Sequence, residues 1–255
     1  MLEALLTPVS DISLLQLALI AAMALVASIV GGVAGYGTGA LLPLVLVPIV
    51  GAEPVVPILS LSALFTNTSR AAAFRSLVDG RRALIVLVAA VPTCALGAWG
   101  YTLLTGRGAA LVIGAMLIAS VPLRRLMRRR GLALSSRGLA AASFGWGPLA
   151  GGTVGAGIIL LSLLMAAGLE GAAVVATDAV ISIGIGLTKL VTFGLAGAVD
   201  ATVIAIALLI GCVAFPGAFL AKAMIGNLPL HLHAAILDAV VIGGGLVMIV
   251  DAFAR

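Results

Sequence analysis

The chain has 255 residues, of which 63% are hydrophobic and only 9% are charged, and its mean hydropathy is +1.32. A soluble domain carries roughly 25% charged residues because its surface faces water, so this composition excludes a soluble globular protein. The net charge of +5 would suggest a nucleic-acid partner only in a soluble chain. We therefore expect an all-α polytopic membrane protein whose outer surface contacts the lipid bilayer, with no nucleic-acid partner.

Apolar segments occupy both halves of the chain. They cover residues 14–33, 38–50, 54–78, 83–104 and 108–123, and then 138–152, 156–168, 171–197, 201–225 and 234–250. The stretch between the halves carries a cluster of arginines, namely Arg124, Arg125, Arg128, Arg129, Arg130 and Arg137. Such a cluster cannot lie in hydrocarbon and is typical of a cytoplasmic loop. We predict a first transmembrane repeat over 1–123, a basic cytoplasmic linker over 124–137 and a second repeat over 138–255.

The two halves repeat one pattern, in which a glycine-broken segment is followed by an acidic corner and a long segment with one basic residue. Gly37 matches Gly155 at an offset of 118 residues (155 − 37), and Arg70 matches Lys189 at 119 (189 − 70). A hydrophobic unit that occurs twice, with a glycine break at the same place, is typical of a membrane transporter.

The stretch 14–50 admits two arrangements. As one helix its 37 residues would be about 55 Å long, far more than a hydrocarbon core of about 30 Å. Either a helix crosses and a short arm returns, which makes the halves inverted repeats, or the break bends one long crossing, which makes them parallel. Lysine and arginine counts do not choose between them. We expect inverted repeats, each with a glycine-broken hairpin followed by three transmembrane helices, and both termini opposite the linker.

The glycine breaks are the first candidate site. Broken helices expose backbone N–H groups, and a helix that starts after a break points its positive dipole end at the gap, which suits an anion. Helix packing through small residues is the alternative interpretation. The predicted substrate-binding residues are Gly35, Gly37, Thr38 and Gly39 in the first break, and Gly152, Thr153, Gly155 and Gly157 in the second.

Polar residues inside the long segments are the second candidate. Asn67, Thr68 and Arg70 lie in one, and Thr177 and Lys189 in its repeat-matched partner. Arg70 and Lys189 form either a substrate vestibule or interfacial anchors whose charges reach water, and both interpretations stay open. Asp178 is a candidate for proton or ion coupling, but it is too far along the helix from Lys189 for direct pairing.

No other motif indicates a cofactor or catalysis. Cys94 and Cys212 lie in apolar segments as free thiols, and His231 and His233, in a predicted loop, have no third ligand nearby for a metal. We expect no metal, no cofactor and no enzymatic activity, since hydrolase, zinc-protease and ATP-binding motifs are absent. Without an ATP site, uphill transport must use an ion gradient.

These residues resemble the sulfite exporter TauE/SafE family of membrane permeases. The resemblance extends over 14–252 and is carried by residues 35–43 (GYGTGALLP), 151–157 (GGTVGAG), 176–178 (ATD) and 193–200 (FGLAGAVD). It implies export or exchange of small sulfur-containing anions such as sulfite or organosulfonates, driven by a proton or ion gradient, in the bacterial inner membrane. Pro148 and Leu149 depart from the glycine-rich backbone of the first repeat, so the two arms need not contribute equally.

The sequence therefore predicts a secondary-active transporter of a small anionic substrate. A passive anion channel is the alternative, and a membrane scaffold or intramembrane enzyme is a third hypothesis. The sequence leaves the substrate, the direction of transport and the assembly into homo-oligomers open.

Overall fold

A computed structural model describes residues 12–34, 38–129, 133–224 and 230–254, and every regular element in these ranges is a helix. The first half contains α2 (Leu14–Ala34), α3 (Thr38–Val50), α4 (Val55–Ala73), the 3-10 turn η2 (Arg75–Leu77), α5 (Gly80–Thr102) and α6 (Gly106–Arg129). The second half contains α7 (Ser136–Gly152), α8 (Gly157–Ala166), α9 (Ala172–Leu195), α10 (Ala201–Ala214), α11 (Gly217–Met224) and α12 (Leu230–Ala254). The predicted all-α class is confirmed.

The outer surface of the helix bundle is apolar. Five stretches within the described ranges are long and apolar enough to cross a bilayer: Leu14–Gly31, Gly80–Thr102, Gly106–Leu123, Ala172–Leu195 and Ala201–Ala221. Large apolar side chains project outward from them; Val88 is 69% exposed, Leu96 68% and Leu195 87%. Contiguous apolar surface of this kind would aggregate in water, whereas lipid solvates it. The chain is a membrane protein.

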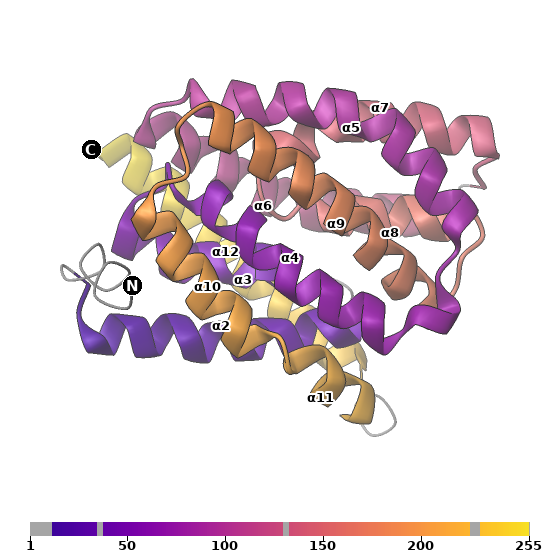
Figure 1. The fold of residues 1–255 in the computed structure, drawn as a ribbon, viewed down its shortest axis with the longest axis horizontal. Helices are drawn as coiled ribbons and strands as arrows, with labels where there is room; N and C mark the ends of the chain where they lie inside the picture. Colours follow the sequence, from indigo (N-terminus) through magenta and orange to yellow (C-terminus); the bar gives the residue numbers. More distant parts are fainter. Residues whose placement is uncertain (1–11, 35–37, 130–132, 225–229, 255) are drawn as a thin grey trace.

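The first glycine break separates a long helix from a short one. α2 has 21 residues, about 31 Å at helical rise, whereas α3 has 13, about 20 Å. α3 packs against α2 and returns toward the end where α2 begins (Figure 1). This arrangement fits the hairpin better than one bent crossing.

The two halves exchange equivalent contacts. α4 packs against its counterpart α9, and α6 packs against its counterpart α12. α5 of the first half packs against α7 of the second, and in the equivalent contact α10 and α11 of the second half pack against α2 of the first. A Cβ at Gly97 of α5 would lie 2.2 Å from the carbonyl oxygen of Pro148 in α7, and a Cβ at Gly217 of α11 would lie 2.4 Å from Oγ of Ser28 in α2. Both helix pairs therefore approach too closely for any residue larger than glycine at these repeat-matched positions.

The repeat-matched helices α4 and α9 run in opposite chain directions (Figure 1). In the same view α2 begins and α12 ends at the left end of the bundle, while α6 ends and α7 begins at the right end. These directions support the inverted arrangement of the halves, which stays a prediction.

The structure corrects three predictions about where helices are interrupted or end, and the first concerns an interruption. The segment 201–225 is broken at Pro216, between α10 and α11, where the carbonyls of Ala214 and Phe215 accept hydrogen bonds from Ser28 Oγ (2.6 Å) and Ser69 Oγ (2.5 Å). Proline cannot donate a backbone hydrogen bond, and the two serines satisfy the carbonyls at the interruption.

The other two corrections concern predicted loops. Helix α6 continues through Arg129 and α7 includes Arg137, so five of the six linker arginines are helical, namely Arg124, Arg125, Arg128, Arg129 and Arg137; Arg130 lies outside the described residues. α7 starts at Ser136 with Ser135 Oγ as its cap. The predicted loop at His231 and His233 is also wrong, because α12 begins at Leu230.

Candidate functional site

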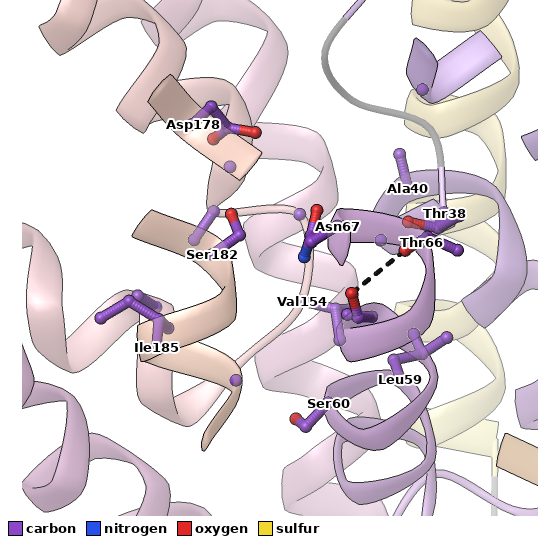
Figure 2. A pocket seen from close by; sticks show the side chains of 18 of the residues that line it. Thr38, Ala40, Leu59, Ser60, Thr66, Asn67, Val154, Asp178, Ser182 and Ile185 are labelled. Atoms are coloured by element: carbon purple, nitrogen blue, oxygen red, sulfur yellow. Dashed lines mark hydrogen bonds between the residues drawn. The ribbon is translucent and has the colours of Figure 1, made fainter. Parts of the chain in front are cut away.

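A cavity of about 150 Å³ lies between α4 and α9, where the two glycine breaks meet. Its volume is enough for several water molecules. Figure 2 shows Asp178, Ser182 and Ile185 of α9 across the cavity from Asn67 of α4. The short helices α3 and α8 begin at its wall, and α2 and α7 contribute Ser28 and Trp146.

The same positions of each half line this cavity. The offset of 119 that relates Arg70 to Lys189 (189 − 70) also relates four further pairs of lining residues, namely Leu59 and Asp178, Ala63 and Ser182, Thr66 and Ile185, and Asn67 and Gly186. The cavity is therefore lined by corresponding sequence positions of the two halves. The two halves nevertheless line the cavity with different chemistry. In each of these four pairs, a polar or charged residue of one half corresponds to a residue with an apolar side chain or a glycine in the other.

The two glycine breaks touch at the cavity. A Cβ at Gly39 would lie 3.2 Å from the backbone nitrogen of Gly155, and Gly155 has a φ of +81°, which L side chains rarely adopt. A Cβ at Gly157, the first residue of α8, would meet no atom within 4 Å, so open space adjoins the start of that helix. The starts of α3 and α8 thus direct their positive dipole ends toward one small volume, while the backbone N–H groups of Ile158 and Ile159 donate to the carbonyls of Gly155 and Ala156.

Thr153 ends α7 in an extended conformation, with φ −154° and ψ −171°. The break beyond it is held by Trp146, whose Nε1 donates to the carbonyl of Ala156 at 2.9 Å. The Thr153 side chain is 3% exposed, and its Oγ1 has no hydrogen-bond partner among the described residues. An unsatisfied buried hydroxyl is costly, so this group has a physical reason to bind a ligand.

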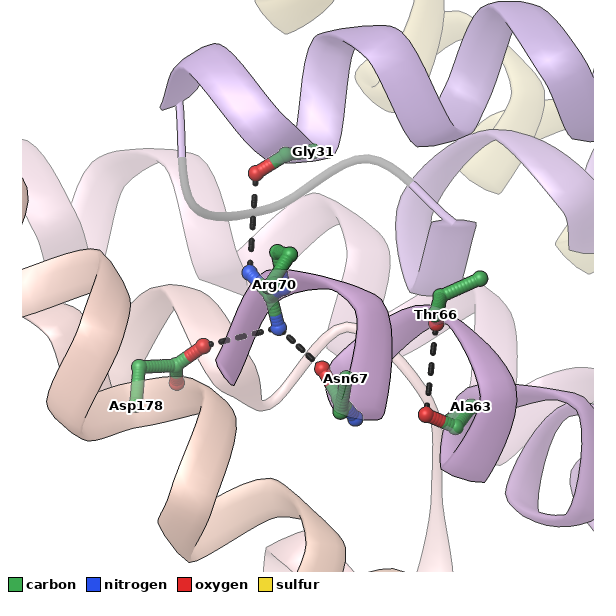
Figure 3. A network of polar contacts seen from close by, with 6 residues as sticks. All are labelled: Gly31, Ala63, Thr66, Asn67, Arg70 and Asp178. Carbon is green, nitrogen blue, oxygen red and sulfur yellow. Dashed lines mark hydrogen bonds and ion pairs between the residues drawn. The ribbon is translucent and has the colours of Figure 1, made fainter. Parts of the chain in front are cut away.

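Arg70 connects the halves through a polar network (Figure 3). Its Nη2 lies 3.0 Å from Asp178 Oδ2 and also donates to Asn67 Oδ1, and its Nη1 lies 3.5 Å from the carbonyl oxygen of Gly31. The side chains of Arg70 and Asp178 are only 11% and 2% exposed. The second oxygen of Asp178, Oδ1, has no partner in the described part of the chain.

Lys189 is the second cation of the cavity. Its Nζ donates to the carbonyl of Thr153 at 3.2 Å, and the residue is 7% exposed. Both basic side chains therefore end at the cavity, which favours a role there over interfacial anchoring. Asp178 pairs with Arg70 from the other half and not with Lys189, eleven positions farther along its own helix.

The structure brings together most, but not all, of the predicted site residues. Those that line the cavity are Thr38, Gly39, Asn67, Arg70, Thr153, Gly155, Gly157, Asp178 and Lys189. Gly35 and Gly37 lie outside the described residues.

Three predicted site residues lie elsewhere. Thr68 is on an exposed face of α4. A Cβ at Gly152 would lie 2.9 Å from the carbonyl oxygen of Gly97, so this glycine serves helix packing. Thr177 Oγ1 accepts a hydrogen bond from the backbone nitrogen of Asp79 at 3.0 Å.

Several lining residues were missed by sequence reasoning, among them Ser28, Ser60, Trp146 and Ser182. Helical spacing could have found some of them, because Ser182 follows Asp178 by one turn and Ser60 precedes Asn67 by two. Ser28 and Trp146 carry no such signal, because only the fold brings α2 and α7 to the cavity.

The cavity brings together two helix starts, a hydroxyl without a described partner and a buried basic side chain, and these groups suit a small anion. No group of three or more His, Cys, Asp or Glu suited to a metal occurs in the residues that the structure describes. A family model described as sulfite exporter TauE/SafE matches residues 20–248, from α2 to α12. No match was found among curated proteins or among solved structures.

Proposed function

The chain belongs to the sulfite exporter TauE/SafE family of membrane permeases, and from this premise we propose that it is a secondary-active transporter of small sulfur-containing anions. Its substrates would be sulfite or an organosulfonate, exported or exchanged at the expense of a proton or ion gradient. The proposed location is the bacterial inner membrane. Members of this family are transporters and not enzymes.

The meeting of the two breaks carries this proposal. Two helices begin at one cavity, beside a hydroxyl, Thr153 Oγ1, that has no partner among the described residues. Helix starts provide N–H donors and positive potential, which suit a tetrahedral or pyramidal oxyanion. Lys189, buried beside Thr153, provides a basic side chain.

The lining of the cavity by corresponding positions of both halves supports a carrier. A site on the axis between inverted repeats can open to either side when one repeat rocks against the other. The ion pair between Arg70 and Asp178 joins α4 of one half to α9 of the other. Movement of one half against the other would therefore have to alter this ion pair, which lies at the proposed binding site. Asp178 remains the candidate for coupling, because its Oδ1 is buried without a partner in the described structure.

Thr153→Val tests whether the anion binds in this cavity. Valine removes Oγ1 and keeps the shape of the side chain, so the fold is expected to be intact. A hydrogen bond to a charged group contributes about 1.5–3 kcal/mol, so sulfite affinity should fall roughly 10- to 100-fold. Ser143→Ala is the matched control, because Ser143 Oγ is also buried without a described partner but Ser143 does not line the cavity. Equal sulfite affinities in wild type and Thr153→Val would contradict the assignment.

A counterflow experiment separates a carrier from a channel. Proteoliposomes loaded with unlabelled sulfite should transiently accumulate labelled sulfite above its external concentration if the protein exchanges anions. A passive channel only dissipates the gradient, so flux without accumulation would contradict secondary transport.

A further inference from the structure

Three of the described residues that line the cavity carry a formal charge: Arg70, Asp178 and Lys189. Residues 35–37 between α2 and α3 are Gly-Tyr-Gly and add no charge. The described lining of the cavity therefore has a formal charge of +1, because it contains two cations and one carboxylate.

The two cations differ in how their charge is compensated. Arg70 forms an ion pair with Asp178 at 3.0 Å. Lys189 donates to a neutral carbonyl, that of Thr153, and none of the ion pairs among the described residues includes it. Among the described residues, the charge of Arg70 is balanced by an ion pair and that of Lys189 is not.

An uncompensated buried charge is costly, because the protein interior solvates an ion less well than bulk water does. A monoanion beside Lys189 would make the occupied cavity neutral. A dianion would leave one uncompensated negative charge, and it would bring that charge close to Asp178, whose Oδ1 has no partner in the described part of the chain.

Resting on the proposed function, we infer that the cavity selects its substrate by charge: it binds monoanions such as an organosulfonate or hydrogen sulfite and discriminates against dianions. Lys189 provides the net positive charge that attracts the anion. Asp178 sets the selection, because its carboxylate occupies Arg70 and thereby limits the cavity to a single excess positive charge.

Methanesulfonate and sulfate are suitable probes, because both are sulfur oxyanions of similar size and their charges of about −1 and −2 do not change near neutral pH. Competition binding on the purified protein would give the affinity ratio. Wild type should bind methanesulfonate at least about tenfold more tightly than sulfate. Asp178→Asn, which raises the formal cavity charge to +2, should shift the ratio at least about tenfold toward sulfate. Lys189→Gln should weaken methanesulfonate by about tenfold or more.

Two further variants control for charge and for folding. Asp79→Asn makes the same chemical change outside the cavity and should leave the ratio unaltered. Arg70→Gln combined with Asp178→Asn removes both members of the ion pair and restores the formal charge of +1, so it should keep the wild-type preference. This double variant also tests the inference if Asp178→Asn alone does not fold, since it leaves no buried arginine without a partner.

The outcomes are distinct. Binding of sulfate as tight as that of methanesulfonate in wild type, an unchanged ratio in folded Asp178→Asn, or a lost preference in the double variant would each overturn charge selection and leave anion transport intact. Failure of wild type to bind any sulfur oxyanion would instead refute the proposed function.

Discussion

The backbone conformation of the second glycine break depends on Gly155. Its φ of +81° belongs to the left-handed region, and a Cβ there would lie 3.3 Å from Leu117 Cδ2 and 3.7 Å from the carbonyl oxygen of Gly39. A side chain would therefore be strained in its backbone and would separate the two breaks. The contact between the repeats at the cavity thus requires glycine at this position.

Gly155→Val should abolish anion binding while the protein still inserts into the membrane. The β-branched side chain is unfavourable at positive φ and crowds the start of α8. Sulfite binding to the purified variant would be compared with Gly145→Val, a change on an exposed part of α7 where a Cβ meets no atom within 4 Å. Normal binding by Gly155→Val would mean that the break only packs helices.

Individual site residues could be predicted where the signal lies within one segment of the sequence. Contacts between residues of two different helices could not be predicted. Glycine clusters and intramembrane charges led to Thr153, Gly155, Arg70 and Lys189, because such groups are expensive in lipid unless they line a cavity. The pairing of Arg70 with Asp178 joins residues 108 positions apart, and helical spacing within one segment cannot reveal it. Thr177 was assigned to the site as a polar residue inside an apolar segment, but its hydroxyl instead accepts a hydrogen bond from the backbone nitrogen of Asp79.

Among the elements, α5 and α7 pack through small residues. A Cβ at Gly147 would lie 1.9 Å from Thr93 Oγ1, and one at Gly151 would lie 2.0 Å from the carbonyl oxygen of Cys94. Helices that approach this closely gain van der Waals contact along their backbones. This contact fixes α7, and with it Trp146 and Thr153, against the first half.

Gly151→Ala should destabilise the protein by about 1–3 kcal/mol, because the added methyl group overpacks the interface and forces α5 and α7 apart. Gly145→Ala, with open space at the same helix, should be neutral or slightly stabilising. Thermal unfolding in detergent would measure both. Equal melting temperatures would show that the two helices can separate without cost.

The start of α5 depends on Asp79. Its carboxylate accepts from the backbone nitrogen of Arg82 at 2.8 Å and pairs with the Arg82 guanidinium, and the hydrogen bond from that backbone nitrogen is the main cause that lowers the pKa of Asp79. Because the folded-state pKa is lowered, this stabilisation is present above the unfolded pKa, near 3.8, and is lost as the pH falls through the lower folded value.

Asp79→Ala should cost about 1 kcal/mol at neutral pH, the usual effect of losing an N-cap. The difference in melting temperature from wild type should shrink below about pH 4, as the wild-type carboxyl becomes protonated. Asp79→Asn retains a capping acceptor and should lie between the two at neutral pH. A difference that is constant down to pH 3 would show that the charge of Asp79 contributes nothing.

Helix positions followed from hydrophobicity, but helix interruptions did not. The apolar segments predicted α2, α3, α5, α8 and α9 to within a few residues, since length and polarity decide what crosses a bilayer. The interruption at Pro216 was missed because its stability depends on Ser28 and Ser69, which lie on other helices. The arginine-rich end of α6 was predicted to be a loop. Charged residues indicate where the chain leaves the membrane, but a helix can continue beyond that point.

At the scale of the whole molecule, the orientation of the repeats decides how the cavity can open. Figure 1 places the start of α2 and the end of α12 at one end of the bundle, and the end of α6 and the start of α7 at the other. Reporter fusions at the two termini should therefore report the side opposite a tag inserted in the linker, and the linker tag should be cytoplasmic because of its arginines. Termini and linker on the same side would contradict the inverted arrangement.

The central claim is that a sulfur oxyanion binds where the two glycine breaks meet. Selenite has the shape of sulfite, and its selenium is located directly by anomalous X-ray scattering in crystals of the protein. We expect one selenium peak inside the cavity, within hydrogen-bonding reach of Thr153 Oγ1 and Lys189 Nζ and beside the first turns of α3 and α8. A selenium peak elsewhere in the protein with this cavity empty, at concentrations that saturate sulfite binding, would contradict the account.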